Sequence, residues 1–220
     1  MNHQPTQPVL TPCTDLESLL RHASEEEEDV SYTLLENLSL DGGAYPGLTF
    51  RNCRFIGCRL TGGSMDRAAF IDCRMDHCDF SNTAMPKMTM QKTKLTDCKL
   101  VGATLCEAFL LDAAFENCVL RYGNFSSSKF RHVRFLECDL SQSSLSGCSL
   151  SKTVFERCLL LRAELFQTSF SGMDLSDCDI SGIAISGQEL RGARVSLEQA
   201  AQLGQMLAGV TLADFSLPKE

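Results

Sequence analysis

The chain has 220 residues, 44% of them hydrophobic, with a formal net charge of −8 and 12 cysteines. This length favours a single domain, and no apolar run approaches the roughly 18 residues that a membrane-spanning helix needs. The N-terminus lacks the basic and apolar regions of a secretory signal peptide. We therefore expect a cytoplasmic protein without a membrane partner.

Residues 1–30 form an acidic N-terminal segment. Met1–Pro12 is polar, contains three prolines and is typical of a disordered tail. Thr14–Glu17 fits a capping box that opens a short helix ending at Arg21 or His22. The helix could cover the exposed edge of the following domain. Glu25–Asp29 is typical of a solvated linker, with contact to a basic partner as the alternative.

From Leu40 to Val195 an apolar residue recurs at every fifth position, 32 times without an insertion. Residues five apart lie about 140° apart on an α-helix and on opposite sides of a β-strand, so neither element alone explains this period. The chain must turn a corner within every five residues. Four such sides close a square coil of 20 residues, and seven cysteines recur with that period: Cys58, Cys78, Cys98, Cys118, Cys138, Cys158 and Cys178.

Each apolar centre, called i, defines the direction of its neighbours. Positions i and i−2 point inward, i−1 and i+1 point outward, and i+2 takes the corner. Ten of the 15 glycines support this frame, because they occupy i+2, where unusual φ/ψ values are useful. They are Gly42, Gly47, Gly57, Gly62, Gly102, Gly147, Gly172, Gly182, Gly187 and Gly192.

Ten cysteines, the seven above with Cys53, Cys73 and Cys148, occupy the inward position i−2. They are predicted to be small buried hydrophobes. Stacked neighbours have parallel Cβ vectors, which is poor disulfide geometry. Reduced thiols also favour a cytoplasmic location. Cys13 and Cys106 are the two thiols that we expect to be accessible.

Segments such as Ala103-Thr104-Leu105, Cys138–Gln142 and Met173–Asp177 resemble the A(D/N)LXX unit of pentapeptide-repeat proteins. The resemblance covers about residues 38–195. It implies an all-β fold, a right-handed quadrilateral β-helix of about eight coils. We expect this β-helix over residues 31–195, with Phe115, Phe135 and Phe155 stacked inside it.

Residues 196–220 are predicted to form a C-terminal helix and tail. Ser196 and Gln199 fit a capping box, and Gly209 fits a C-terminal stop. The helix either caps its own β-helix or pairs with a second copy about a two-fold axis. Its start, Leu197–Ala200, and the apolar segment Val210–Leu212 resemble the dimerising C-terminus of quinolone-resistance pentapeptide proteins. That resemblance implies a homodimer joined through Leu197, Ala200, Leu203 and Leu207.

Residues for catalysis are not grouped in the sequence. His3, His22, His77 and His132 are scattered, so no arrangement resembles a Ser/His/Asp or Cys/His site. Cys106 has Glu107 beside it and no adjacent base, which argues against an activated nucleophile. We expect a protein that is not an enzyme, with no cofactor and no metal.

The net charge is unevenly distributed along the chain. Residues 1–38 carry −7, residues 196–220 carry −2 and residues 39–195 carry +1. One side of the expected coil nevertheless has an outward or corner carboxylate in six successive coils: Asp76, Asp97, Glu116, Glu137, Glu156 and Asp177. The next side but one is expected to be basic, with Lys92, Lys129, Arg131 and Lys152. Charges that only prevent edge aggregation would explain both stripes.

The family resemblance adds a functional expectation to the acidic stripe. In the resembled subfamily the rod is an acidic mimic of DNA that binds a type II topoisomerase, which implies DNA gyrase or topoisomerase IV as partner and no direct nucleic-acid binding. The frame has no outward loop like those of drug-protecting members, so binding or inhibition is expected rather than protection from drugs. An alternative is a scaffold that binds another protein through an apolar patch: Val101, Val119, Tyr122, Leu159 and Leu161.

Overall fold

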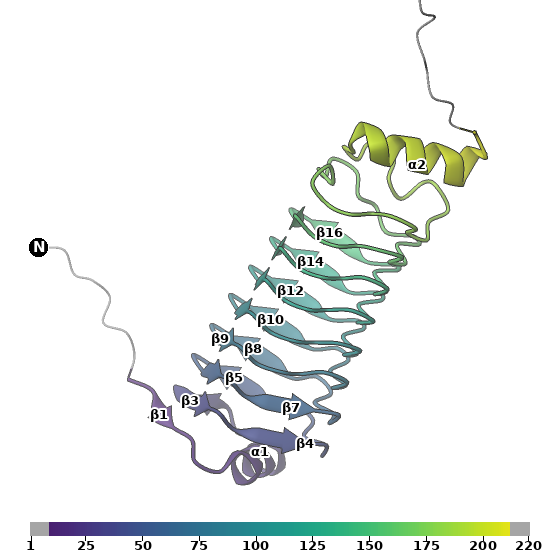
Figure 1. Ribbon diagram of the computed structural model, residues 1–220. Coiled ribbons are helices and arrows are strands. Elements are labelled where there is room, and N and C mark those ends of the chain that lie inside the picture. The colour runs from purple at the N-terminus through teal and green to yellow at the C-terminus, as the bar shows by residue number, and fades with distance from the viewer. Residues whose placement is uncertain (1–8, 212–220) are drawn as a thin grey trace, which may run out of the picture.

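The computed structural model describes residues 9–211. Most of these residues form a rod-shaped parallel β-solenoid with four sides, and a helix lies at each end (Figure 1). Every strand pairs in parallel with strands one coil away in register, for example Phe115 with Phe135. The five-residue frame therefore predicted the fold correctly.

The four sides are named here by their apolar centres. Face 1 is centred on Phe55 and its counterparts at intervals of 20 residues, face 2 on Leu60, face 3 on Met65 and face 4 on Phe70. Face 1 carries an eight-stranded sheet: β1 (Thr11–Pro12), β3 (Thr33–Glu36), β6 (Arg54–Ile56), β9 (Arg74–Asp76), β11 (Lys94–Thr96), β13 (Ala114–Glu116), β15 (Arg134–Leu136) and β17 (Val154–Glu156).

Face 4 carries a seven-stranded sheet: β2 (Val30–Ser31), β5 (Thr49–Arg51), β8 (Ala69–Ile71), β10 (Thr89–Gln91), β12 (Phe109–Leu111), β14 (Lys129–Arg131) and β16 (Ser149–Ser151). Face 2 begins with β4 (Ser39–Asp41) and β7 (Arg59–Thr61) and continues as isolated bridges to Asp179. Face 3 consists of isolated bridges that end at Ala184. The two large sheets stop at β16 and β17, earlier than the bridges of faces 2 and 3.

The interior is filled by stacked side chains of the same kind. Phe115 and Phe135 stack with ring centroids 4.9 Å apart, and Phe135 and Phe155 stack at 5.0 Å. All three rings are buried, as predicted. Five apolar centres are only half-buried, because they lie near an end of the solenoid or beside the last strands: Leu40, Leu150, Ile185, Leu190 and Val195.

The ten inward cysteines are buried and free, which confirms the sequence prediction. All of their thiols except that of Cys78 donate to backbone carbonyls of the preceding coil; Cys138 Sγ, for example, lies 3.4 Å from the carbonyl oxygen of Phe115. Burial raises the pKa of the Cys148 thiol to about 11. Cys13 and Cys106 are half-buried, so they are less exposed than expected.

The corners have the left-handed backbone that the glycine positions predicted. Gly102 has a φ of 66°, and corner residues with side chains adopt similar values, such as 57° at Asn82 and 49° at Lys92. Left-handed φ is unfavourable for residues with a Cβ atom. The repeated ladder hydrogen bonds therefore hold these corners in place.

Helix α1 (Leu16–Glu25) covers the N-terminal end of the solenoid, as expected, with Leu20 completely buried. Its N-cap is Asp15 rather than Thr14, and it extends beyond His22. The expectation of disorder up to Pro12 is wrong for Thr11–Pro12, which pair with β3. Residues 1–8 lie outside the described part of the chain.

The acidic run Glu25–Asp29 is not a free linker. It completes the last turn of α1 and leads directly into β2. The carboxylate of Asp29 lies 2.5 Å from Arg51 Nε, and that of Glu28 lies 3.7 Å from His22 Nε2. The run therefore fixes the entry of the chain into the solenoid.

Helix α2 (Leu197–Ala208) crosses the C-terminal end of the solenoid (Figure 1). The predicted capping box between Ser196 and Gln199 is present, and Gly209 ends the helix with a φ of 65°. The Gln199 side chain also donates to the carbonyl oxygens of Leu175 at 2.9 Å and Cys178 at 2.6 Å. Of the two arrangements predicted for the helix, the structure therefore shows contact with its own solenoid.

Candidate protein-binding surfaces

Face 1 carries the six carboxylates that the sequence placed in a line. Asp76, Glu116 and Glu156 follow the apolar centre in alternate coils, and Asp97, Glu137 and Asp177 occupy corners in the coils between and after them. Because each residue belongs to a parallel coil, neighbouring members of the line are about 4.8 Å apart along the rod axis. The geometry thus supports a continuous column, called the carboxylate column below.

Three carboxylates of the column form ion pairs with the same spacing of 22 residues. Arg54 lies 3.4 Å from Asp76, Lys94 lies 2.7 Å from Glu116 and Arg134 lies 2.5 Å from Glu156. In each pair the base precedes the apolar centre of one coil and the acid follows the apolar centre of the next. Hydrogen bonds from Arg134 lower the pKa of the Glu156 carboxyl.

The corner carboxylates have polar partners as well. Glu137 lies 2.9 Å from Arg157, and Asp177 accepts a hydrogen bond from the Arg157 backbone N–H at 3.2 Å. Asp97 lies 3.8 Å from His77 Nδ1 and accepts a hydrogen bond from Asn117. Face 1 is therefore a mixed ladder of acids and bases, which reduces its negative potential.

The basic residues that the sequence assigned to a second stripe are on face 4. Lys92, Lys129, Arg131 and Lys152 lie there or at its corner, in the coils centred on Met90, Phe130 and Leu150. His132, at the corner after Arg131, lies 3.0 Å from Asp112. The prediction that this stripe is two sides away from the acids is wrong, because face 4 directly precedes face 1 in every coil. Acidic and basic columns therefore run side by side along the rod.

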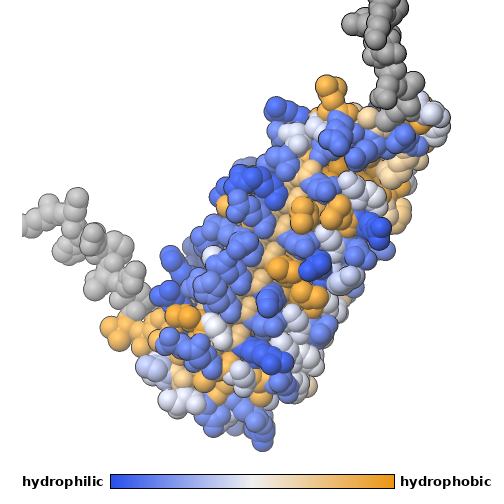
Figure 2. All heavy atoms as spheres, in the orientation of Figure 1, coloured by the Kyte–Doolittle hydropathy of each residue, from blue (hydrophilic) through white to orange (hydrophobic). Residues whose placement is uncertain are grey.

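The residues of the predicted apolar patch belong to face 2. Leu159 is 41% exposed and Tyr122, at a corner, is 55% exposed, whereas Val101, Val119 and Leu161 are half-buried. In the space-filling view, apolar side chains form an interrupted band along the rod between polar ones (Figure 2). Phe109, which is 39% exposed, is a separate apolar residue on face 4.

The predicted dimer residues divide into two groups on α2. Leu203 is half-buried against the solenoid core. Leu197, Ala200 and Leu207 are exposed, with exposed fractions of 92% for Leu197 and 49% for Leu207. These three lie within about 80° of one another around the helix axis. Leu203 therefore supports the cap, Leu207 lies partly against the corner at Gly187, and Leu197 and Ala200 are directed away from the solenoid.

A buried carboxylate in the last coil was missed by the sequence reasoning. Glu189 occupies an outward position of the frame but is only 4% exposed. It accepts hydrogen bonds from the Ser186 hydroxyl and from the backbone N–H groups of Gln167, Ser186 and Gly187. Burial would raise the pKa of this carboxyl, but the hydrogen bonds lower it to about 2.

The side chains with catalytic potential stay apart. His22, His77 and His132 lie on different coils or elements, and His3 is outside the described residues. Between residues 9 and 211, no group of three or more His, Cys, Asp or Glu side chains is arranged to hold a metal ion. None of the helices in this range is long and apolar enough to cross a membrane.

Comparisons with solved structures find similarity to two proteins of known structure, among others. QnrB1, a plasmid-mediated fluoroquinolone resistance protein, is 20% identical in a trypsin-treated form, with 85% of this chain and 92% of that chain covered and a TM-score of 0.44. HetL, a pentapeptide repeat protein involved in heterocyst differentiation regulation from the cyanobacterium Nostoc sp. strain PCC 7120, is 21% identical, with 83% and 98% covered and a TM-score of 0.40. A comparison with curated proteins finds no match.

Family comparisons match the solenoid directly. The family described as "Pentapeptide repeat region" matches residues 68–145. The family described as "Pentapeptide repeats (8 copies)" matches residues 50–85 and 138–182. Together the matches span residues 50–182, which is more than half of the chain. With its five-residue frame and four-sided parallel solenoid, the chain belongs to the pentapeptide-repeat family.

Proposed function

We propose that this protein is a non-enzymatic protein-binding rod that presents its carboxylate column to the DNA-binding groove of a type II topoisomerase, DNA gyrase or topoisomerase IV. The observation that carries the proposal is the column itself, a line of six carboxylates on one flat face of a narrow rod. A basic groove that accepts a DNA duplex would recognise such a line through charge complementarity.

The ion pairs of face 1 are compatible with this role because they are exposed. The Glu137 and Arg157 side chains, for example, are 54% and 56% exposed. An exposed ion pair contributes only about 0–1 kcal/mol to stability. Arginine or lysine side chains of a partner can therefore replace the internal bases at small cost.

A dimer would extend the column. The exposed face of α2, made of Leu197, Ala200 and Leu207, lies at the end of the rod. Two copies joined there about a two-fold axis would place two solenoids end to end. The proposal therefore includes a homodimer in which the carboxylate surface is about twice as long.

A supercoiling assay with purified protein and DNA gyrase tests the proposal. We expect inhibition at micromolar protein concentration in low salt and its loss in the triple variant E116K/E137K/E156K. The matched control is D66K/E107K/E164K, which reverses three outward or corner acids of face 3 and should inhibit like the wild type. If wild-type protein leaves supercoiling unchanged, the topoisomerase proposal is rejected.

A scaffold that binds another protein through face 2 is the second candidate. It is favoured by the exposure of Leu159 and Tyr122 on a face where apolar residues recur in neighbouring coils. Replacing Val119 and Leu159 with Asp should abolish such an interaction, whereas the face 1 triple variant should retain it. The two candidates therefore respond oppositely to the same pair of variants.

A further inference from the structure

Eight lysine and arginine side chains among the described residues form no ion pair with a carboxylate. They are Arg74, Lys92, Lys99, Lys129, Arg131, Lys152, Arg162 and Arg191. All eight are exposed. Lys99 and Arg162 belong to face 2 and its corner, whereas the other six lie on face 4 or on the edge of face 1 that adjoins it. The unpaired positive charges of the rod are therefore concentrated on one side.

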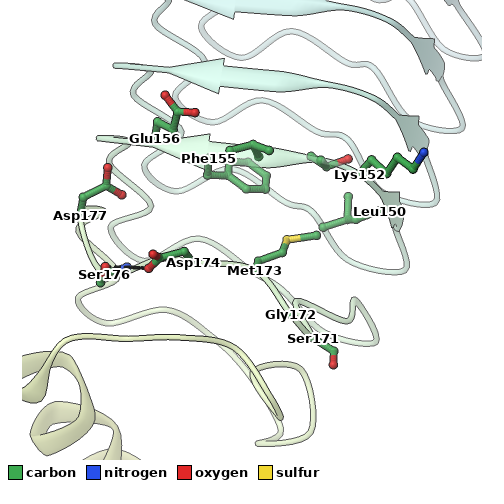
Figure 3. Close-up of a pocket in the computed structure, with 12 residues that line it drawn as sticks. Leu150, Lys152, Phe155, Glu156, Ser171, Gly172, Met173, Asp174, Ser176 and Asp177 are labelled. Carbon is green, nitrogen blue, oxygen red and sulfur yellow. Dashed lines mark hydrogen bonds between the residues drawn. The ribbon is translucent and has the colours of Figure 1, made fainter.

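Five of these bases form a row along the rod, called the basic ridge below: Arg74, Lys92, Lys129, Arg131 and Lys152. The row begins in the coil that contains β8 and β9 and ends in the coil that contains β16, four coil steps or about 19 Å along the axis. Lys152, at the end of the row, extends away from Glu156, Asp174 and Asp177 (Figure 3). The ridge thus presents positive charge in four of five successive coils.

The acids of the molecule leave this positive charge largely uncompensated. Asp72 and Asp112 occupy corners along the ridge, and Asp112 lies 3.0 Å from His132. The carboxylate column runs along the opposite edge of face 1. The acidic run Glu25–Asp29 joins β2, four coil steps or about 19 Å from the middle of the ridge. Because the Debye length is only about 8 Å at physiological salt, the ridge attracts anions despite the negative net charge of the chain.

An exposed aromatic ring lies within the same surface. Phe109 is 39% exposed on β12, and it pairs in register with Lys129 of the next coil. Leu111, on the same strand, is half-buried and pairs with Arg131. A ring beside unpaired cations is the combination by which proteins hold single-stranded nucleic acids, since bases stack on the ring and phosphates contact the cations.

The backbone of face 4 favours a nucleic acid over an acidic peptide. Each strand in the middle of this sheet has a partner on both sides; β12, for example, pairs with β10 and β14. An extended peptide therefore finds no strand edge along the ridge to which it could add. A single-stranded nucleic acid needs no such edge. A duplex keeps its bases stacked on one another, so the exposed ring of Phe109 favours a single strand.

We propose that the basic ridge and Phe109 bind single-stranded nucleic acid. The phosphates contact the ridge cations along the corner between faces 4 and 1, and one base stacks on the Phe109 ring beside Lys129. The expectation of no direct nucleic-acid binding came from the family resemblance alone, and this proposal replaces it. The site uses none of the six carboxylates of the column, so it is independent of topoisomerase binding.

Fluorescence anisotropy of a labelled oligothymidine, about 20 nucleotides long, with the full-length protein tests the proposal. In K92E/R131E we expect the affinity to fall about tenfold or more, and the slope of log affinity against log salt to fall by about 1.4, since each lost phosphate contact accounts for about 0.7. The matched control K99E/R162E changes the net charge equally, at unpaired bases of face 2 and its corner, and should bind like the wild type.

A second variant tests the stacking contact separately from charge. F109A should lower the affinity for oligothymidine about fivefold or more without changing the salt slope, because it removes a stacking surface and no phosphate contact. Its control is F166A, which removes another exposed ring, 42% exposed on face 3, and should have no effect. Equal affinities of F109A and wild type would remove the ring from the site and overturn the proposal as stated.

Competition experiments decide between the possible anionic partners. Unlabelled oligothymidine should displace the probe at lower concentration than a DNA duplex of the same length or poly-L-glutamate. A duplex that competes equally well would mean that only phosphates are recognised, and poly-L-glutamate that competes equally well would indicate a surface for acidic proteins. Either result overturns the single-strand proposal, as does wild-type protein that fails to bind oligothymidine in low salt, or equal losses in K92E/R131E and K99E/R162E.

Discussion

Single residues show how strictly the frame controls burial and where it fails. Inward cysteines, threonines and phenylalanines are buried because each occupies position i or i−2 of a coil that has neighbours above and below. Glu189 occupies an outward position of the last coil but is buried. Its carboxylate accepts a hydrogen bond from the backbone N–H of Gln167 in the preceding coil. A carboxylate that replaces a backbone carbonyl gives this position a dependence on pH.

We expect stability to fall in acid through Glu189. Its pKa is lowered to about 2 in the folded protein, whereas an unfolded Glu has a pKa of about 4.3. The stabilisation is therefore complete above about pH 4.3 and is lost as pH falls towards 2. Urea unfolding between pH 2 and pH 7 should show this loss in the wild type and a smaller one in E189Q.

At neutral pH, E189A should lower the free energy of unfolding by roughly 2–4 kcal/mol, because it leaves buried donors without an acceptor. The control is E164A, which removes an exposed carboxylate of face 3 and should change stability by less than about 0.5 kcal/mol. Equal effects of the two variants would contradict the role assigned to Glu189.

The thiols give a second prediction for single residues. The ten inward thiols are buried, so an alkylating reagent in solution cannot reach them in the folded protein. Rapid alkylation of the native protein should therefore modify only Cys13 and Cys106, and alkylation after unfolding should modify all 12 cysteines. Fast native labelling of a ladder cysteine, followed by mass mapping, would show that the solenoid opens locally.

Among the elements, α2 combines two tasks on different sides of one helix. Gln199 and Leu203 attach it to the last coil, while Leu197 and Ala200 point elsewhere and are exposed. This division could not be read from the sequence, because the period of a helix gives the relative angles of its residues but not which angle faces the solenoid.

The exposed side of α2 predicts the result of a dimer test. L197D/A200D should be monomeric in analytical ultracentrifugation, because it places charges in a buried apolar contact, while the wild type should be dimeric. Leu203 is unsuitable for this test since it supports the cap. Q202D/Q205D adds the same charge to other sides of the helix and should remain dimeric; monomeric wild-type protein would remove the dimer from the proposal.

The solenoid could be predicted from the sequence almost residue by residue, because an unbroken period determines both the direction of each side chain and its neighbours. The ion pairs between residues 22 apart could also have been predicted from the sequence, because Arg54 and Asp76 occupy the same positions of the five-residue frame as Lys94 and Glu116. Strand β1 was not predictable, because its pairing with β3 depends on contacts across α1. Which bases of face 4 lack an acidic partner required knowledge of the side-chain positions.

For the whole molecule, the distribution of charge predicts how partner binding depends on salt. Binding through the carboxylate column should weaken steeply between about 0.05 and 0.5 M salt, because added salt shortens the Debye length over which the charges of the two proteins attract each other. Binding through the apolar patch of face 2 should change little over that range. Measuring the affinity between this protein and its binding partner at both salt concentrations separates the two candidate functions.

The unbroken five-residue period also determines which changes in length the rod can accept. Removing 20 residues, such as 83–102, takes out one full coil and returns every later side chain to its original face. Removing five residues keeps the inward positions inward but rotates everything after the deletion by a quarter turn, so the carboxylates of later coils would continue on a different face. Evolution can therefore lengthen or shorten this surface only in steps of one coil if the two halves of a binding site are to stay aligned.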